Sequence, residues 1–378
     1  MNNIAIGICR LIAAVLLFCS CGGRDKTAAS SDCTTDSLSH SSLLKISRGD
    51  GFTRVDMADP WNSGRTLHTY LLIPADNDMP ETLPQGTVVR TPLQRAVVAT
   101  SVHCGLISSL GCLESIAGVC DPQYINLPEI TLGITKGSIA DCGNGITPTV
   151  EKIIDIDADA ILLSPFQNSG GYGKIEKTGI PIIEAADYME SSALGRAEWM
   201  KFYGMLFGAE ERANNMFADI EQRYGELKIM AARAKERSSV LFDRQNGAAW
   251  YVPGGHSTIG GLLRDACADN PFADDRHSGS VALPFESVLE RAAHCNVWMI
   301  RYNSPRDLTL ADLKTDKDGY SRFDAWQTGN VYGCNTNHST YYEDTPFNPD
   351  RLLRDLIIIC HPSLADSLGQ PEYFVRMK

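Results

Sequence analysis

Two stretches decide the fold that this sequence predicts: PTVEKIIDIDADAILL at residues 148–163 and PFESVLERAAHCNVWMI at residues 284–300. Each begins with a proline and an early glutamate, Glu151 in the first and Glu286 in the second, which suits the first turn of a helix. Each then ends in an unbroken apolar run, of the kind found in a parallel strand that is covered on both faces. The repeated setting predicts two similar α/β lobes.

A long amphipathic helix is predicted between the two stretches, from Glu210 to about Glu236. Its apolar residues recur at alternating spacings of four and three, which makes one continuous stripe: Ala213, Phe217, Ile220, Tyr224, Leu227, Ala231 and Ala234. At about 1.5 Å per residue this helix is roughly 40 Å long, which is more than one small lobe needs. We therefore predict an α/β fold with two lobes, each a mostly parallel sheet flanked by helices, joined by one long helix.

The amino terminus reads as a targeting segment. The apolar stretch Leu11 to Phe18 is too short to span a bilayer, follows Arg10, and is followed by the small Ser20 before Cys21. This pattern is typical of a bacterial lipoprotein signal with Cys21 as the lipidated residue; Cys19 is a competing candidate, and a plain secreted protein is the alternative. We expect a lipid-anchored protein of the bacterial cell envelope that faces the periplasm.

The remaining chain divides by composition and pattern. Residues after Cys21 are polar and small, which predicts a disordered tether. Strands at 67–73 and 87–90 read as a lead-in hairpin, and 239–242 with 248–252 as a second hairpin. The expected parts are a signal peptide at 1–20, a tether at 21–45, a first lobe with lead-in hairpin at 46–208, a linking helix at 209–237 and a second lobe at 238–378.

Charge and cysteine usage narrow the classes of function. The formal net charge is −12, and no basic stripe is present, so nucleic acid is not an expected partner. Three of the 12 cysteines lie in the signal, and the others show no CxxC pair or zinc-like spacing. We interpret most of them as buried thiols, with one disulfide still possible.

The glutamate repeat, the linking helix, and the closing segment from Asn348-Pro349 to His361-Pro362 together resemble the substrate-binding proteins of ABC importers for iron chelates and cobalamin. The resemblance covers about Thr91 to Leu364. It implies that Glu151 and Glu286 meet arginines on an ABC permease dimer, which works with its ATPase subunits. It also implies a monomer with no cofactor of its own, whose ligand is a corrinoid or a ferric siderophore, with little rotation between the lobes.

Enzyme readings find little support in the motifs. The sequence has no GxSxG, no HExxH and no glycine-rich phosphate loop. His103 and Cys104 form a dyad only by adjacency, and neighbours on a strand point to opposite faces. A metal-dependent hydrolase of an exported α/β fold remains the alternative.

Residues just past the strand ends are the candidates for lining a ligand cleft between the lobes. Their mixture of aromatic and amide side chains suits a bulky, partly apolar ligand. Only Lys174, Arg244 and Arg301 offer positive charge nearby, which favours a neutral or zwitterionic corrinoid over an anionic siderophore, with haem as a third alternative. The predicted ligand-binding residues are His103, Asp141, Phe166, Gln167, Tyr172, Trp250, His256, Tyr302, Asn303, Tyr341 and Tyr342, together with Asn144 and Asn168.

Overall fold

The computed structural model of the chain describes residues 34–167 and 171–378. The signal peptide, Cys21, the first part of the tether and Asn168 lie outside these residues. Among the helices that are described, none is long and apolar enough to cross a bilayer. The eight cysteines in this part of the chain are free thiols, and six of them are buried, which confirms the reading of most cysteines as small apolar residues.

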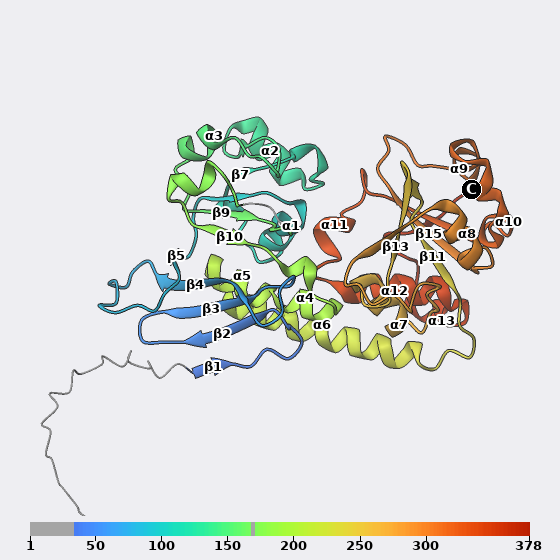
Figure 1. Cartoon of the computed structure of the whole chain (residues 1–378), viewed down its shortest axis with the longest axis horizontal. Helices are drawn as coiled ribbons and strands as arrows, with labels where there is room; N and C mark the ends of the chain where they lie inside the picture. The colour runs from blue at the N-terminus through green and yellow to red at the C-terminus, as the bar shows by residue number, and fades with distance from the viewer. Residues whose placement is uncertain (1–33, 168–170) are drawn as a thin grey trace, which may run out of the picture. The chain divides into compact units, whose positions relative to one another are not determined.

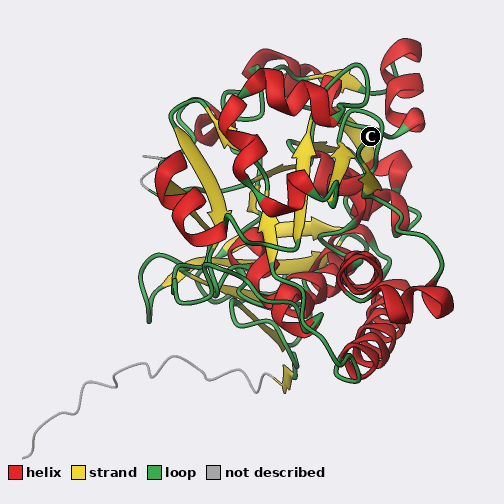
Figure 2. Cartoon of the chain, turned by 90° about the vertical axis from the view of Figure 1, so that its right-hand side faces the viewer, coloured by secondary structure: helices red, strands yellow, loops and turns green. Residues whose placement is uncertain are grey.

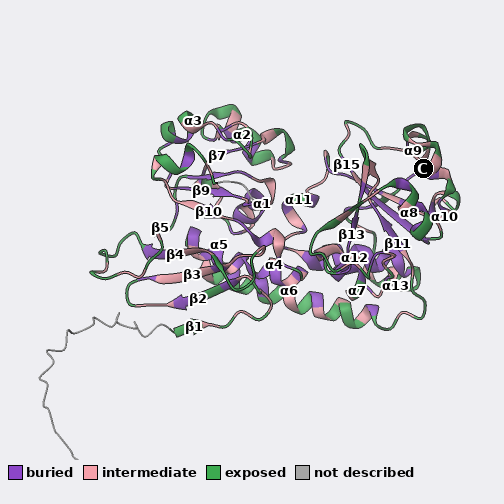
Figure 3. Ribbon diagram, in the orientation of Figure 1, coloured by how far each residue is buried: buried purple, intermediate pink, exposed green. Residues whose placement is uncertain are grey.

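The first lobe contains a wholly parallel sheet in the order β10-β9-β6-β7-β8. All residues of the two central strands, β6 and β9, are buried, as expected for strands covered on both faces (Figure 3). The strands are β6 Ala96–Val98, β7 Ile116–Val119, β8 Ala140–Asp141, β9 Ala160–Leu163 and β10 Ile182–Glu184. The flanking helices are α1 Ser101–Ser109, α2 Pro128–Lys136 and α3 Val150–Asp155.

The second lobe contains a four-stranded sheet in the order β11-β15-β16-β17, in which only β17 is antiparallel. Helices flank the strands, as Figure 2 shows. The strands are β11 Val240–Phe242, β15 Val297–Tyr302, β16 Val331–Asn335 and β17 Val375–Arg376. The helices are α7 Thr258–Asp265, α8 Phe285–Ala292, α9 Leu310–Asp316, α10 Asp324–Gln327, α11 Tyr341–Asp344, α12 Pro349–Cys360 and α13 Pro362–Leu368.

A separate three-stranded sheet corrects the second predicted hairpin. Strand β13 (Ala249–Pro253) does not pair with β11; it pairs with β12 (Gln245–Asn246) and β14 (Ser280–Leu283). The edge of β11 is instead taken by β15, which runs parallel to it. Gly247, which has a φ of 60°, forms the turn that closes β12 onto β13, and a glycine adopts this left-handed conformation at no steric cost.

The predicted linking helix is α6, Glu210–Ala231, shown in yellow-green in Figure 1. It ends five residues before the predicted Glu236 (236 minus 231). Its first half buries Phe217 and Ile220 in the core of the first lobe, and its second half buries Tyr224 and Ala231 in a core of the second lobe. A single rigid element therefore contributes to two cores, which is the role that its length predicted.

The amino-terminal sheet differs from the lead-in hairpin that the sequence predicted. Strands β1 to β5 form a five-stranded sheet in sequence order, in which β4 and β5 are parallel. The connection 75–86 is long enough to return to the start of the neighbouring strand, as a parallel crossover requires, whereas a tight hairpin needs only a few residues. The strands are β1 Thr34–Asp36, β2 Leu44–Arg48, β3 Thr53–Ala58, β4 Thr66–Pro74 and β5 Thr87–Thr91.

The predicted tether is too long at its carboxyl end. Residues 34–36 already form β1, and the segment 39–43 is held by two buried carboxylates, those of Glu190 and Glu198. Glu198 accepts hydrogen bonds from three consecutive backbone N–H groups, those of Ser39, His40 and Ser41. The folded body therefore begins by residue 34.

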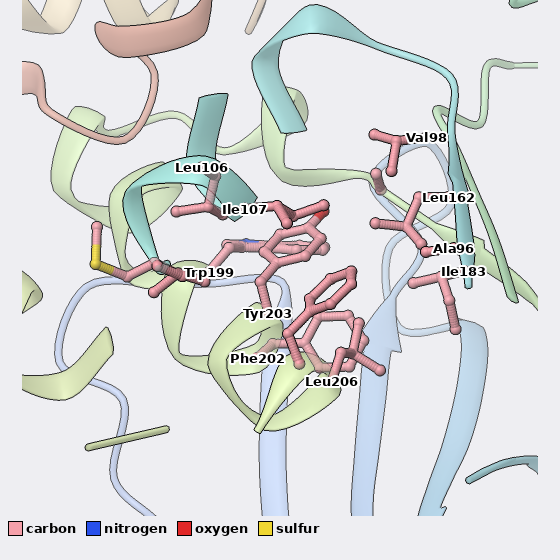
Figure 4. Close-up of a cluster of buried hydrophobic side chains, with 14 of the residues drawn as sticks. Ala96, Val98, Leu106, Ile107, Leu162, Ile183, Trp199, Phe202, Tyr203 and Leu206 are labelled. Carbon is pink, nitrogen blue, oxygen red and sulfur yellow. The ribbon is translucent and has the colours of Figure 1, made fainter. Parts of the chain in front are cut away.

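An aromatic core lies where the amino-terminal sheet, the first-lobe sheet and two helices meet, and Figure 4 shows its centre. Phe202, Tyr203 and Leu206 of α5 (Met200–Phe207) pack with Trp199 and the strand residues Ala96, Val98, Leu162 and Ile183. Helix α4 (Ala193–Glu198) precedes α5 and contacts α7 and α12 of the second lobe. Short 3-10 turns at Leu113–Ser115, Pro122–Tyr124, Ile175–Thr178, Asp187–Met189 and Asp318–Arg322 complete the fold.

The two lobes also touch through α1 and α11. The close approach depends on Gly105, because a Cβ atom there would lie 2.1 Å from the backbone oxygen of Glu343. Asn126 of the first lobe donates its side-chain amide to the carbonyls of Thr336 and Ser339, at 2.7 and 2.9 Å. Its backbone N–H donates to the buried Glu343 carboxylate at 2.8 Å. The lobes are therefore joined by α6, by the contacts of α4 with α7 and α12, and by this contact between α1 and α11.

Candidate functional site

The first lobe carries a cavity of about 740 Å³ beyond the carboxyl ends of β6, β7 and β9, which we call the first-lobe pocket. This is the edge at which open parallel sheets bind ligands. Two large apolar side chains on it are exposed, Ile146 at 76% and Phe166 at 50%. Its other lining residues include Thr100, Asp121, Asn144, Ser164, Tyr172, Lys174 and Tyr188.

The second lobe carries a smaller cavity of about 510 Å³ beyond the carboxyl ends of β11 and β15, which we call the second-lobe pocket. Two exposed tyrosines line it, Tyr251 at 50% and Tyr342 at 42%. The rest of its lining is mostly polar or charged: Asp243, Arg244, Gln245, Asn246, Gly247, Arg301 and Asp316. One pocket is thus dominated by apolar groups and the other by charged ones.

An aspartate with a left-handed backbone orders each pocket. Asp121 follows β7 with a φ of 48°, and Asp243 follows β11 with a φ of 57°. Asp tolerates this conformation better than most residues, and strained positions of this kind cluster at functional sites. The Asp121 carboxylate accepts the backbone N–H of Gly145 at 2.8 Å, and so holds the loop that carries Ile146. In the second-lobe pocket, the Asp243 carboxylate holds the side chain of Arg301.

Both arginines of the second-lobe pocket are paired. Asp243 accepts two hydrogen bonds from the Arg301 guanidinium, with Oδ1 at 3.0 Å from Nε, and Asp316 pairs with Arg244. Burial would lower the pKa of the Arg301 guanidinium, but the charge of Asp243 holds this pKa well above its ordinary value. The guanidinium also lies 5.7 Å from the ring centre of Tyr341. Arg301 is therefore a fixed cation with a fixed direction.

The structure brings four of the predicted ligand-binding residues to the pockets. Phe166 and Tyr172 line the first-lobe pocket, and Tyr342 lines the second-lobe pocket. Asn144 also lies in the first. All three cations identified from the sequence, Lys174, Arg244 and Arg301, are in the pockets as well.

Three other predictions are corrected because the side chains are buried. Trp250 is fully buried in the second-lobe core, where its indole N–H donates to the carbonyl of Phe242 at 2.9 Å. His103 lies within α1, not at a strand end, and bonds to Asp187. Tyr341 packs among Tyr342, Tyr373 and Phe374. None of the three offers a free surface to a ligand.

The remaining predicted residues do not line either pocket. Asp141, Gln167, His256 and Asn303 are exposed elsewhere. Tyr302 is buried and lines a separate cavity near β17, and its hydroxyl oxygen accepts the backbone N–H of Leu308 at 3.1 Å.

The residues that shape the pockets and that sequence reasoning missed include Asp121, Tyr188, Asp243 and Tyr251. A signal was present for two of them, because Asp121 directly follows the apolar run IAGVC at 116–120 and Asp243 directly follows the predicted strand 239–242. Tyr251 follows from strand alternation, because its neighbour Trp250 points into the core. Tyr188 lies in a 3-10 turn and has no comparable signal in the sequence.

Glu151 and Glu286 lie where the sequence placed them, each in the first turn of its helix. Glu151 belongs to α3 and Glu286 to α8, and both are exposed. Thr149 and Pro284, the residues before each helix, form no side-chain capping hydrogen bond, and each glutamate is the acidic residue of its first turn. Ile154, one turn after Glu151, is also exposed, at 56%.

Comparisons with known proteins agree with this geometry. A 208-residue stretch is 24% identical to the petrobactin-binding protein of Bacillus subtilis, covering 53% of this chain and 62% of that protein. Over 285 residues the chain is 26% identical to an uncharacterized lipoprotein of Methanocaldococcus jannaschii, covering 73% and 67%. The Fe3+-Desferal-bound siderophore-binding protein of Vibrio cholerae has the same fold, with a TM-score of 0.52, 16% identity, and coverage of 71% of this chain and 99% of that one.

A match to a family model assigns the chain to a protein family. The family described as periplasmic binding protein matches residues 119–337, more than half of the chain. This match and the lipoprotein relative support a location in the cell envelope. The members are binding proteins and not enzymes, so the metal-dependent hydrolase is not favoured. The chain belongs to the periplasmic binding protein family.

Proposed function

We propose that this protein is the substrate-binding component of an ABC importer, which captures a metal chelate and delivers it to the permease. The observation that carries the proposal is the pair of pockets, one per lobe, each beyond the carboxyl ends of parallel strands. The relatives that bind petrobactin and Fe3+-Desferal support a chelate as the ligand. The paired lobes on a common helix support capture by both pockets.

The side chains that line the two pockets indicate what kind of chelate the protein binds. Phe166 and Ile146 favour an apolar body in the first-lobe pocket, and Arg301 with Tyr342 favours a polar or charged end in the second. A carboxylate on the ligand would share Arg301 with Asp243, and would not meet a free cation. A corrinoid and a ferric siderophore both meet this description, since each combines an apolar frame with polar groups at its edge.

The proposal also covers the lipid anchor of the protein and its docking onto the permease. Cys21 would carry the lipid anchor, and the polar residues after it would form the tether to the folded body. Glu151 on the first lobe and Glu286 on the second would dock onto the two subunits of the permease. Their exposure, one on each lobe, is what such docking requires.

Titration with ferric desferrioxamine and with dicyanocobinamide tests the binding role. We expect at least one of them to bind, with an affinity that falls about tenfold in Phe166→Ala and in Tyr342→Ala, because aromatic anchors dominate binding energy. Tyr124→Ala is the matched control, since Tyr124 is 59% exposed and lines neither pocket. Equal affinity in all three variants, or turnover of either probe, would count against the proposal.

A further inference from the structure

Three hydroxyl groups in the lining of the first-lobe pocket form hydrogen bonds to other groups of the protein. Thr100 Oγ1 lies 2.5 Å from His103 Nδ1. The hydroxyl of Tyr172 donates to Glu184 Oε1 at 2.9 Å, and that of Tyr188 donates to the carbonyl of Pro165 at 2.5 Å. A hydroxyl has one hydrogen and two lone pairs. Where the hydrogen is used in the wall, only lone pairs remain for a ligand.

The direction of the Thr100 hydrogen depends on a buried network behind it. His103 Nε2 lies 2.9 Å from Asp187 Oδ1, and Arg196 Nε donates to Asp187 Oδ2 at 2.8 Å. Burial would raise the pKa of Asp187, but the positive charge of Arg196 and the hydrogen bonds from His103 and Arg196 hold it below its ordinary value. An ionised carboxylate only accepts hydrogen bonds, so Nε2 of His103 carries a hydrogen.

The balance of buried charges bears on whether the other ring nitrogen of His103, Nδ1, carries a hydrogen. Arg196 already neutralises Asp187, so a second full cation on the buried His103 would lack its own counter-charge, which is costly in a protein interior. With the hydrogen of the neutral ring on Nε2, Nδ1 is bare, and the Thr100 hydroxyl at 2.5 Å donates to it. The rings of Tyr203 and Phe347, with centroids 5.1 and 6.1 Å from the imidazole, hold its plane.

Of the remaining lone pairs of the three hydroxyl oxygens, only one accepts a hydrogen bond from the described residues of the protein. One lone pair of Thr100 accepts the backbone N–H of His103 at 3.3 Å, as the N-cap of α1, which leaves one free. Burial raises the pKa of the Tyr172 and Tyr188 phenols, so both keep the hydrogen that they donate. Their free lone pairs are available to the pocket.

We propose that the first-lobe pocket selects ligands that present hydrogen-bond donors, N–H or O–H groups on an apolar body, to the oxygens of Thr100, Tyr172 and Tyr188. This inference rests on the proposed function, and specifies the cargo as a chelate with amide or ammonium N–H groups on the part that enters this pocket. His103 and Asp187 are positioning residues, because they act through Thr100. Lys174, an exposed donor in the lining, serves the acceptor atoms of the same ligand.

A matched pair of small probes tests this polarity without knowledge of the natural ligand. Benzamide and methyl benzoate share an aromatic body, but only the amide has N–H donors. In NMR titrations of the protein we expect benzamide to bind at the first-lobe pocket more tightly than the ester. Its affinity should fall about two- to tenfold in Tyr172→Phe, in Tyr188→Phe and in Thr100→Val, the range of one lost hydrogen bond. The affinity for the ester should not change.

Thr100→Ser keeps the hydroxyl and should bind benzamide like the wild type, which separates the hydroxyl from the size of the side chain. The two phenylalanine variants keep the test valid if Thr100→Val weakens the cap of α1. The 15N shifts of His103, assigned with His103→Gln, should show a hydrogen on Nε2 and none on Nδ1. Ester binding as tight as amide binding, or a hydrogen on Nδ1, would overturn the inference. Failure of every metal chelate to bind would contradict the proposed function while leaving this preference measurable.

Discussion

Charge reversal at both Glu151 and Glu286 is expected to stop uptake through the importer while ligand affinity stays at the wild-type value. Both carboxylates are exposed and line neither pocket, so the substitutions leave both pockets unchanged. A pair of exposed charges is worth only about 0–1 kcal/mol, but placing like charges together at an interface costs several kcal/mol. Two arginines facing the cationic side chains expected on the permease would therefore prevent docking. Uptake of a radiolabelled chelate in cells measures the effect.

The matched control reverses two exposed glutamates of α6, Glu211 and Glu226. This double variant has the same net charge as the docking variant and should transport normally. Each arginine at a helix start can cost up to about 1 kcal/mol of stability, which thermal unfolding will report separately. Normal uptake by the Glu151→Arg, Glu286→Arg protein would remove the docking role, as would a loss of ligand affinity in it.

Among the substitutions proposed for this protein, Glu198→Ala is expected to lower the free energy of unfolding the most. The Glu198 carboxylate is completely buried, accepts the backbone N–H groups of Ser39, His40 and Ser41 at 2.8 to 3.0 Å, and pairs with Lys201 at 2.8 Å. Lys201 is partly exposed, so the main cost is that of leaving the three backbone N–H groups without their acceptor, on the order of 1–3 kcal/mol. The variant should therefore unfold at lower denaturant concentration, as measured by circular dichroism. Glu211→Ala, at an exposed site, should change the free energy of unfolding by less than about 0.5 kcal/mol.

The contribution of Glu198 should also depend on pH. Burial would raise its pKa, but hydrogen bonds from Lys201 and from the backbone of Ser39 and Ser41 hold the pKa below its ordinary value. A carboxylate with a lowered pKa stabilises the fold above its unfolded pKa, about 4.3, and loses this contribution as the pH falls through the folded value. The stability gap between wild type and Glu198→Ala should be full at neutral pH and shrink below about pH 4. A gap that stays constant down to pH 3 would contradict this account.

The sequence predicted the parts of the fold that depend on local periodicity. The apolar runs at 160–163 and 297–300 became central strands, and the stripe of α6 became the helix that enters both cores. Long-range partners were beyond such patterns. The polar segment 39–43 reads as a tether because its own composition cannot bury surface, yet Glu190 and Glu198 bind it from far along the chain.

The candidate site shows the same limit at the scale of one residue. Tyr251 and Tyr342 line the second-lobe pocket, whereas their neighbours Trp250 and Tyr341 point into the core. Adjacent residues of a strand such as β13 face opposite sides, and adjacent residues of a helix such as α11 point about 100° apart, so a one-residue error exchanges a ligand residue for a core residue. Composition identified the right neighbourhood of the chain, and only the placement of β13 and α11 decided which aromatic ring is free.

The most direct test of the central claim is the identity of the molecule that the protein carries. The protein should be purified from its native host and examined by native mass spectrometry, visible absorption and metal analysis. We predict one bound chelate per chain, with a metal content close to one equivalent and an absorption spectrum that tells a corrinoid, a haem and a ferric siderophore apart. A bound molecule without metal would contradict the assignment as a metal-chelate-binding protein.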